Sequence, residues 1–112
     1  MKRFVFFGVL IILAFWCDRS PAIDCRQGAD YYYRAKSAAN RQQSIKWLQR
    51  STAACPNFNA WYMLGLIFRE QGQLDQAVNA FTQARAVAGS IQAEALAIGR
   101  KGEILSQTGH LP

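Results

Sequence analysis

The chain has little of what most catalytic and metal sites require. Its one histidine is His110, and it has no C-x-x-C motif, no glycine-rich phosphate loop and no nucleophile motif. Acidic residues number only seven, and no pair of them shares a face of a predicted helix. General acid-base catalysis and metal binding both depend on such groupings. We therefore expect no catalytic activity, no cofactor and no metal site.

Proline is also scarce. None lies between Pro56 and Pro112, so nothing in that stretch interrupts a helix. The length of 112 residues allows one small domain. A hydrophobic content of 51% argues against a disordered chain, and the distribution of apolar residues argues against a polytopic membrane protein. The composition favours a small helical domain.

The only long apolar run is the thirteen-residue stretch from Phe4 to Trp16. Lys2 and Arg3 precede it, and the small residues of Ser20-Pro21-Ala22 follow. A basic start, a short apolar run and a small-residue site are typical of a secretory signal peptide, whereas a spanning helix needs about 17–25 residues. We predict a signal peptide over residues 1–22 and export of residues 23–112 to the periplasm or the secreted space.

Cys17 offers an alternative reading of the same segment. A cysteine directly after an apolar run resembles the lipid-bearing cysteine of bacterial lipoproteins. Their processing motif has a small residue before the cysteine, and Trp16 stands there in this chain. A lipoprotein anchored to the membrane through Cys17 remains the alternative to a released protein.

Removing residues 1–22 leaves ten basic and six acidic residues, a net charge of +4, and two cysteines, Cys25 and Cys55. If residues 27–39 and 42–54 form an antiparallel helical hairpin, the two cysteines lie at its open end. An even cysteine count in an exported chain favours a disulfide. We predict a Cys25–Cys55 disulfide, with two free buried thiols as the alternative.

The sequence repeats itself with a period in the mid-thirties. Residues 60–75 resemble residues 97–112 at a shift of 37, and residues 43–51 resemble residues 76–84 at a shift of 33. Within each segment the apolar residues recur every three or four positions, which is typical of helices. Gly72 is placed to end a helix in the left-handed conformation, and Asn40 and Gly89 mark other breaks. Two kinds of helix therefore alternate.

One segment carries a recognisable repeat motif, with aromatic, leucine, glycine and alanine residues at characteristic spacings. Together these residues resemble the tetratricopeptide repeat (TPR) signature: Trp61, Leu64, Gly65, Phe68, Gly72, Ala77, Phe81 and Ala84. The second unit, about 58–89, matches well, the first, about 25–57, is degenerate in its opening helix, and the third, from about 92 to 112, is partial.

The resemblance implies an all-α fold, a short right-handed superhelix of antiparallel helix pairs with about two and a half repeats. It also implies a concave groove that binds a partner peptide or helix, and hence a non-enzymatic adaptor or assembly factor of the cell envelope or secreted space. Nucleic acid is not expected as a partner. The groove residues would be Tyr33, Lys36, Tyr62, Leu66, Arg69, Arg100 and Glu103.

An array of two and a half repeats buries its apolar faces incompletely, because about three units are usually needed. The disulfide, a capping role of the last helix, or association with another chain, a homo-oligomer included, would offset this. We expect Ile98, Gly102 and Leu105 to form the inner face of the last helix and to pack on residues 74–87, or in part on a partner.

Residues 26–50 support an alternative function. Six basic residues lie there against the single acidic Asp30, beside Tyr31, Tyr33 and Trp47. A basic run with aromatic neighbours suits an anionic surface or polymer. Binding of such a ligand by this basic face is the alternative to groove binding.

Overall fold

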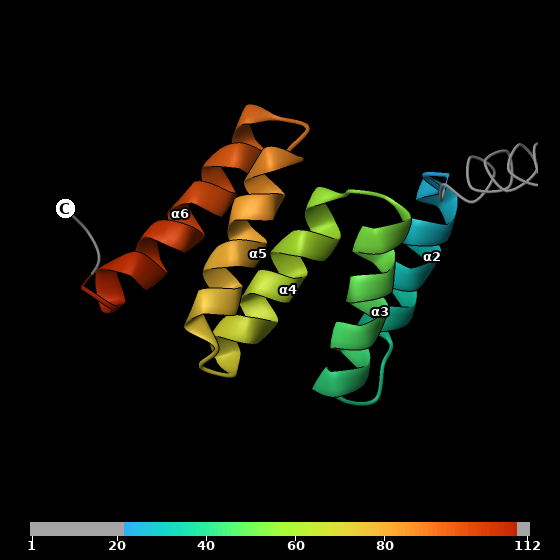
Figure 1. Ribbon diagram of the computed structural model, residues 1–112, viewed down its shortest axis with the longest axis horizontal. Coiled ribbons are helices and arrows are strands. Elements are labelled where there is room, and N and C mark those ends of the chain that lie inside the picture. Colours follow the sequence, from blue (N-terminus) through green and yellow to red (C-terminus); the bar gives the residue numbers. More distant parts are fainter. Residues whose placement is uncertain (1–21, 110–112) are drawn as a thin grey trace, which may run out of the picture.

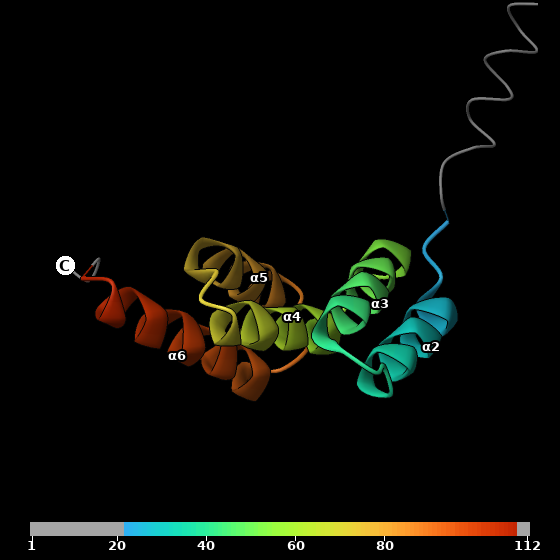
Figure 2. The same cartoon turned by 90° about the horizontal axis from the view of Figure 1, so that it is seen from below.

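The computed structural model describes residues 22–109, which form five α-helices and no strand. The predicted signal peptide up to residue 21, Cys17 within it, and the final residues from His110 lie outside the described part. Both views show the helices as a row in which each helix lies against the next (Figures 1 and 2). In chain order they are α2 (Cys25–Lys36), α3 (Arg41–Ala54), α4 (Phe58–Glu70), α5 (Leu74–Ala86) and α6 (Ile91–Gln107).

Four of the five helices begin at a side-chain cap. The side chains of Asp24, Asn40, Asn57 and Ser90 each accept a hydrogen bond from the backbone N–H three residues later, at 2.8–3.1 Å. The cap at Asp24 starts α2 two residues before the predicted start of the first helix, at residue 27. The same helix ends at Lys36 rather than at residue 39.

The turn between α4 and α5 has the predicted left-handed glycine. Gly72 has a φ of +76°, and the backbone N–H of Gln73 donates to the carbonyl of Phe68 at 2.9 Å. This pattern satisfies the last carbonyls of α4 without a side chain, because glycine adopts a positive φ at little cost.

The α2–α3 hairpin is joined by polar contacts and a disulfide. The buried hydroxyl of Ser51 donates to the carbonyl of Gly28 at 2.6 Å, and that of Ser44 donates to the carbonyl of Ala35 at 3.0 Å. Cys25, the first residue of α2, is bonded to Cys55, the C-cap of α3. The disulfide closes a loop with a sequence separation of 30, which contributes ~3.5 kcal/mol in the chain-entropy model.

The α4–α5 pair packs through one glycine and one aromatic ring. Phe81 is fully buried, and a Cβ added at Gly65 would lie 2.6 Å from its ring. The absence of a side chain at position 65 is therefore what lets the ring lie against the backbone of α4. Ala77 and Ala84, also fully buried, keep the rest of the contact between the two helices close.

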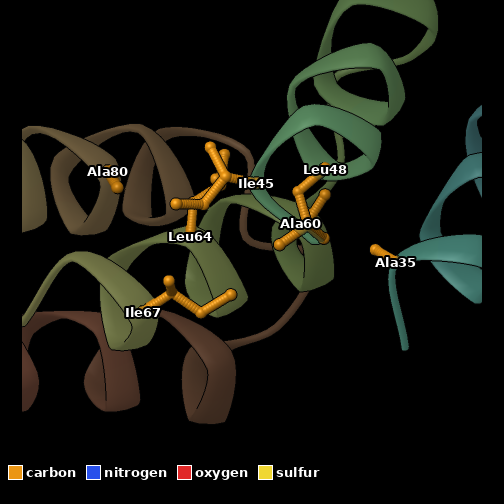
Figure 3. Close-up of a cluster of buried hydrophobic side chains, with 7 residues drawn as sticks. All are labelled: Ala35, Ile45, Leu48, Ala60, Leu64, Ile67 and Ala80. Atoms are coloured by element: carbon orange, nitrogen blue, oxygen red, sulfur yellow. The ribbon is translucent and has the colours of Figure 1, made fainter. Parts of the chain in front are cut away.

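A second group of apolar residues joins the hairpin to α4. Figure 3 shows Ile45 and Leu48 of α3 beside Ala60 and Leu64 of α4, all of them buried. Tyr32, Trp47, Trp61, Met63 and Phe68 pack around this group and are partly buried. The core thus runs along the row of helices rather than filling a sphere.

The last helix packs on α5 as expected, but through a different face. Ala97 and Ile104 are its buried residues, and Ile104 joins Ala77 and Phe81 in one cluster. Ile98, predicted to face inward, is 45% exposed. The prediction was wrong for Ile98, because the helix is rotated so that position 97 rather than 98 faces the preceding pair. Leu105 is half-buried beside Leu74 and Val78 of α5, as predicted. No helix within residues 22–109 combines the length and apolar character needed to cross a membrane.

The close contact at Gly65 leads to the first prediction. Gly65→Ala should destabilise the protein by about 1–3 kcal/mol, because the buried ring of Phe81 has no space into which to move. Gly99→Ala is the matched control: a Cβ there meets nothing within 4 Å, and alanine should stabilise helix α6 by about 0.5–1 kcal/mol. Denaturant unfolding of the two variants measures both effects. Equal stability of the two variants would contradict the role of Gly65.

Candidate functional site

Four polar side chains form a network between α4 and α6. The guanidinium of Arg100 donates through Nε to the hydroxyl of Tyr62 at 3.0 Å and through Nη1 to the carboxylate of Glu103 at 3.2 Å. Arg69 donates to the same carboxylate oxygen at 2.9 Å. Glu103 therefore bridges two arginines, one from each helix. We call this group the α4–α6 network.

The network holds more positive than negative charge. Arg69 and Arg100 share Glu103, and the neighbouring Glu70 pairs with Arg41 of α3 at 3.1 Å. The hydrogen bonds that Arg100 donates to Tyr62 and to Glu103 raise its pKa above the ordinary value. Arg100 is cationic at neutral pH, as arginine ordinarily is, and one of the two positive charges is not neutralised within the network.

Packing holds the aromatic member of the network in place. The ring of Tyr62 stacks on Phe58 with a centroid separation of 5.3 Å and meets Phe81 edge to face at 5.6 Å. Its hydroxyl is thus fixed at the point where Arg100 reaches α4. The side chain of Leu66, one turn further along α4, is partly exposed beside it.

An open cavity of about 340 Å³ lies against the network. It is lined by Leu66, Arg69, Glu70 and Arg100, so an apolar side chain and both signs of charge border the same space. Ligand sites commonly combine an apolar surface with a few fixed polar groups. This arrangement suits a peptide that presents an apolar residue next to an acidic one.

The structure brings five of the seven predicted groove residues to this region, namely Tyr62, Leu66, Arg69, Arg100 and Glu103. Tyr33 and Lys36 lie on α2, away from the network. Tyr33 is 65% exposed and lines a small hollow beside the disulfide, and the ammonium of Lys36 lies 5.9 Å from its ring centroid. Their part in partner binding stays a prediction.

A larger cavity that the sequence did not suggest lies between the hairpin and α4. It has a volume of about 380 Å³, and Lys36 lines it together with Ala35, Leu48, Met63 and Ile67. Met63 and Ile67 lie one turn apart on α4, a spacing that marks them as one face of the helix. Ile67 is buried and Met63 is partly exposed, so this face of α4 borders both the core and the cavity.

In the basic region of residues 26–50, one tryptophan ring contacts another aromatic ring and two arginines. The ring of Trp47 stacks on Tyr31 at 5.6 Å, and the guanidinium groups of Arg34 and Arg50 lie 5.2 and 4.9 Å from the centroid of Trp47. Arg34 is paired with Asp30 at 2.9 Å. We call Tyr31, Arg34, Lys46, Trp47 and Arg50 the basic aromatic face.

The residues of the repeat motif have structural roles. Leu64, Gly65, Ala77, Phe81 and Ala84 are buried between helices, whereas Trp61 and Phe68 are partly buried around them and Gly72 forms the turn. None of these residues belongs to the α4–α6 network. The motif thus builds the frame, and the residues between motif positions form the candidate site.

Comparison with known proteins supports the repeat. Residues 58–89, which contain α4 and α5, match the family model of the tetratricopeptide repeat. No curated protein sequence and no solved structure matches the chain. The resemblance to TPR proteins and the all-α fold of packed adjacent helix pairs are therefore confirmed. Repeats of this kind generally mediate interactions between proteins and are typically not enzymes.

Proposed function

We propose that this protein is a non-enzymatic adaptor or assembly factor that holds a segment of a partner protein against the α4–α6 network. One observation carries the proposal: two first helices of successive units present Tyr62, Arg69, Arg100 and Glu103 around an open cavity. Aromatic and arginine side chains are enriched where proteins bind one another. The uncompensated positive charge favours a partner segment with an acidic residue.

The test of groove binding is affinity capture with variants that keep the fold. Arg69 and Arg100 are partly exposed, so Arg69→Ala with Arg100→Ala should leave the core intact, whereas Tyr62→Ala would remove a ring that packs on Phe58 and Phe81. The double variant should retrieve at least about tenfold less of the partner, as expected for the loss of two arginine contacts at an interface.

The matched control is Asn79→Ala with Gln83→Ala, which changes two exposed residues of α5. The control should retrieve the same partner as the unchanged protein. Equal capture by the arginine variant and the control would contradict binding at the α4–α6 network.

We further propose that the protein works after export, in the periplasm or the secreted space, as residues 23–112. The Cys25–Cys55 disulfide supports this because such bonds persist in oxidising compartments. A lipid anchor on Cys17 is the alternative form.

Intact-mass measurement of the protein isolated without reductant tests both statements. The expected mass is that of a chain beginning at Ile23 that accepts no thiol label before reduction and two labels after it. A lipid-modified chain beginning at Cys17 would support the anchored form. Labelling of both cysteines without reduction would contradict the disulfide.

A second function has its own support in the basic aromatic face. An aromatic ring with two guanidinium groups close to it is a suitable contact for an anionic surface, since the ring supplies apolar area and the arginines supply charge. Lys46 and Arg50 are exposed and form no ion pair in the described residues.

Vesicles containing one anionic lipid in four test this second function. Lys46→Gln with Arg50→Gln should weaken vesicle binding several-fold, and binding by the unchanged protein should fall steeply as salt rises. Arg69→Gln with Arg85→Gln, the same loss of charge on α4 and α5, is the control. If both double variants bind equally, the basic aromatic face has no specific role.

A further inference from the structure

The outer surface of α6 has an uninterrupted apolar stripe. Ile91, Ala95, Ile98, Gly102 and Leu105 are separated alternately by four and three residues, so they line up along one face of the helix. Ile91 is 81% and Ile98 45% exposed, and no charged residue interrupts the series. We call these five residues the α6 seam.

The first three seam residues, Ile91, Ala95 and Ile98, are exposed, whereas Gly102 and Leu105 are half-buried and Leu105 lies beside Leu74 and Val78 of α5. The buried residues of the helix, Ala97 and Ile104, are on the other side and contact α5. Both views place α6 at one end of the row, with its partners α5 and α4 on a single side (Figures 1 and 2). Within residues 22–109 no helix covers the seam from Ile91 to Ile98.

A glycine recurs in the first helix of each unit and marks where the next helix packs. A Cβ added at Gly28 would lie 3.1 Å from the Cβ of Cys55 at the end of α3, and one added at Gly65 would lie 2.6 Å from the ring of Phe81 in α5. Gly102 follows at the same interval of 37 residues, yet a Cβ there would meet nothing within 4 Å. Gly102 is thus a helix contact point that no described residue fills.

The charges beside the seam identify a second α6 as its complement. Glu94 and Lys101 are half-buried along the flank next to α5, each directly before a seam residue, and Glu94 also pairs with Arg85 at 3.4 Å. The other flank has the uncharged Gln92, Gly99 and Ser106. In an antiparallel pair of identical helices, equivalent flanks face each other. With Ile98 of both copies at the two-fold axis, Glu94 of each copy lies opposite Lys101 of the other. A parallel pair would instead place each charged flank against an uncharged one.

The same register also matches the apolar residues by size. Ile91 lies opposite Leu105 of the second copy, so large residues meet at the two ends of the interface. Ala95 lies opposite Gly102 of the second copy, and these small residues allow the two helices to approach closely. A two-fold interface requires such self-complementarity. We therefore propose that two copies of this protein associate through antiparallel packing of their α6 seams.

This self-association is independent of partner binding at the α4–α6 network. Arg100 and Glu103 are not members of the seam, and they point toward α4, where they contact Tyr62 and Arg69. A dimer formed through the seam leaves both networks accessible, and it joins two sites in one assembly.

The mass of the purified protein in solution, measured by light scattering over a range of concentrations, tests the proposal. The unchanged protein should have twice the mass of one chain. The Ile98→Glu variant should be monomeric at every concentration, because the substitution places two carboxylates opposite each other at the two-fold axis. Its helical content and the thermal midpoint of the single chain should be unchanged. Leu96→Glu, which adds the same charge at an exposed position of α6 outside the seam, should remain dimeric.

Charge exchange tests the register. Lys101→Glu should weaken the dimer about tenfold, because two attractive pairs become repulsive. Adding Glu94→Lys to that variant restores opposite charges across the interface and should restore the dimer. In this exchange Arg85, which pairs with Glu94 within one chain, loses an exposed ion pair and gains a lysine as its neighbour, and at an exposed surface both changes have a small effect on stability. An unchanged protein that is monomeric at all concentrations, or an Ile98→Glu variant that is as dimeric as the control, would overturn the proposal.

Discussion

Close packing of each first helix against the helix that follows it is the constraint on which this structure depends. The contact is made at a glycine: Gly28 lies against the end of α3, and Gly65 lies against the ring of Phe81. A side chain at position 65 would collide with the buried ring of Phe81 and push the two helices apart, whereas one at position 28 would make a tight contact. Because the pairs pack this closely, an array with few large apolar residues still buries two apolar clusters, one around Leu48 and Leu64 and one around Phe81, and the positions of the polar side chains follow from them.

The first unit reaches the same geometry with different chemistry. Its second helix has Leu48 and Ser51 where α5 has Phe81 and Ala84, and the hydroxyl of Ser51 bonds the carbonyl of Gly28. The disulfide then joins the ends of the two helices, and loop closure offsets the smaller apolar area of this pair. A hydrogen bond to a buried backbone carbonyl fixes the register of the two helices. Apolar contacts alone specify that register less strictly.

The α4–α6 network depends on the packing of three helices. Tyr62 and Arg100 are 38 residues apart in the sequence, and they meet because α5 holds α4 and α6 at a suitable separation. Each ion pair at this partly exposed surface adds little to stability. The network therefore contributes little to folding stability, and the packed helices hold its charged groups at fixed positions.

The helices and their pairing could be predicted from the sequence. Helical periodicity, the glycine at position 72 and the repeated spacing are local properties, and together with the cysteine count they predicted the repeat and the hairpin with its disulfide. The resemblance to the repeat signature supplied the groove residues on α4 and α6, whose part in partner binding stays a prediction. Which face of α6 is inside could not be predicted, because Ala97 and Ile98 differ by one position and packing against Phe81 and Ala77 selects between them. The cavity beside Met63 and Ile67 could not be predicted either, because it is lined by residues of three helices that are far apart in the sequence. Local patterns specify the elements, whereas the angle and rotation between elements follow from contacts made by residues far apart in the chain.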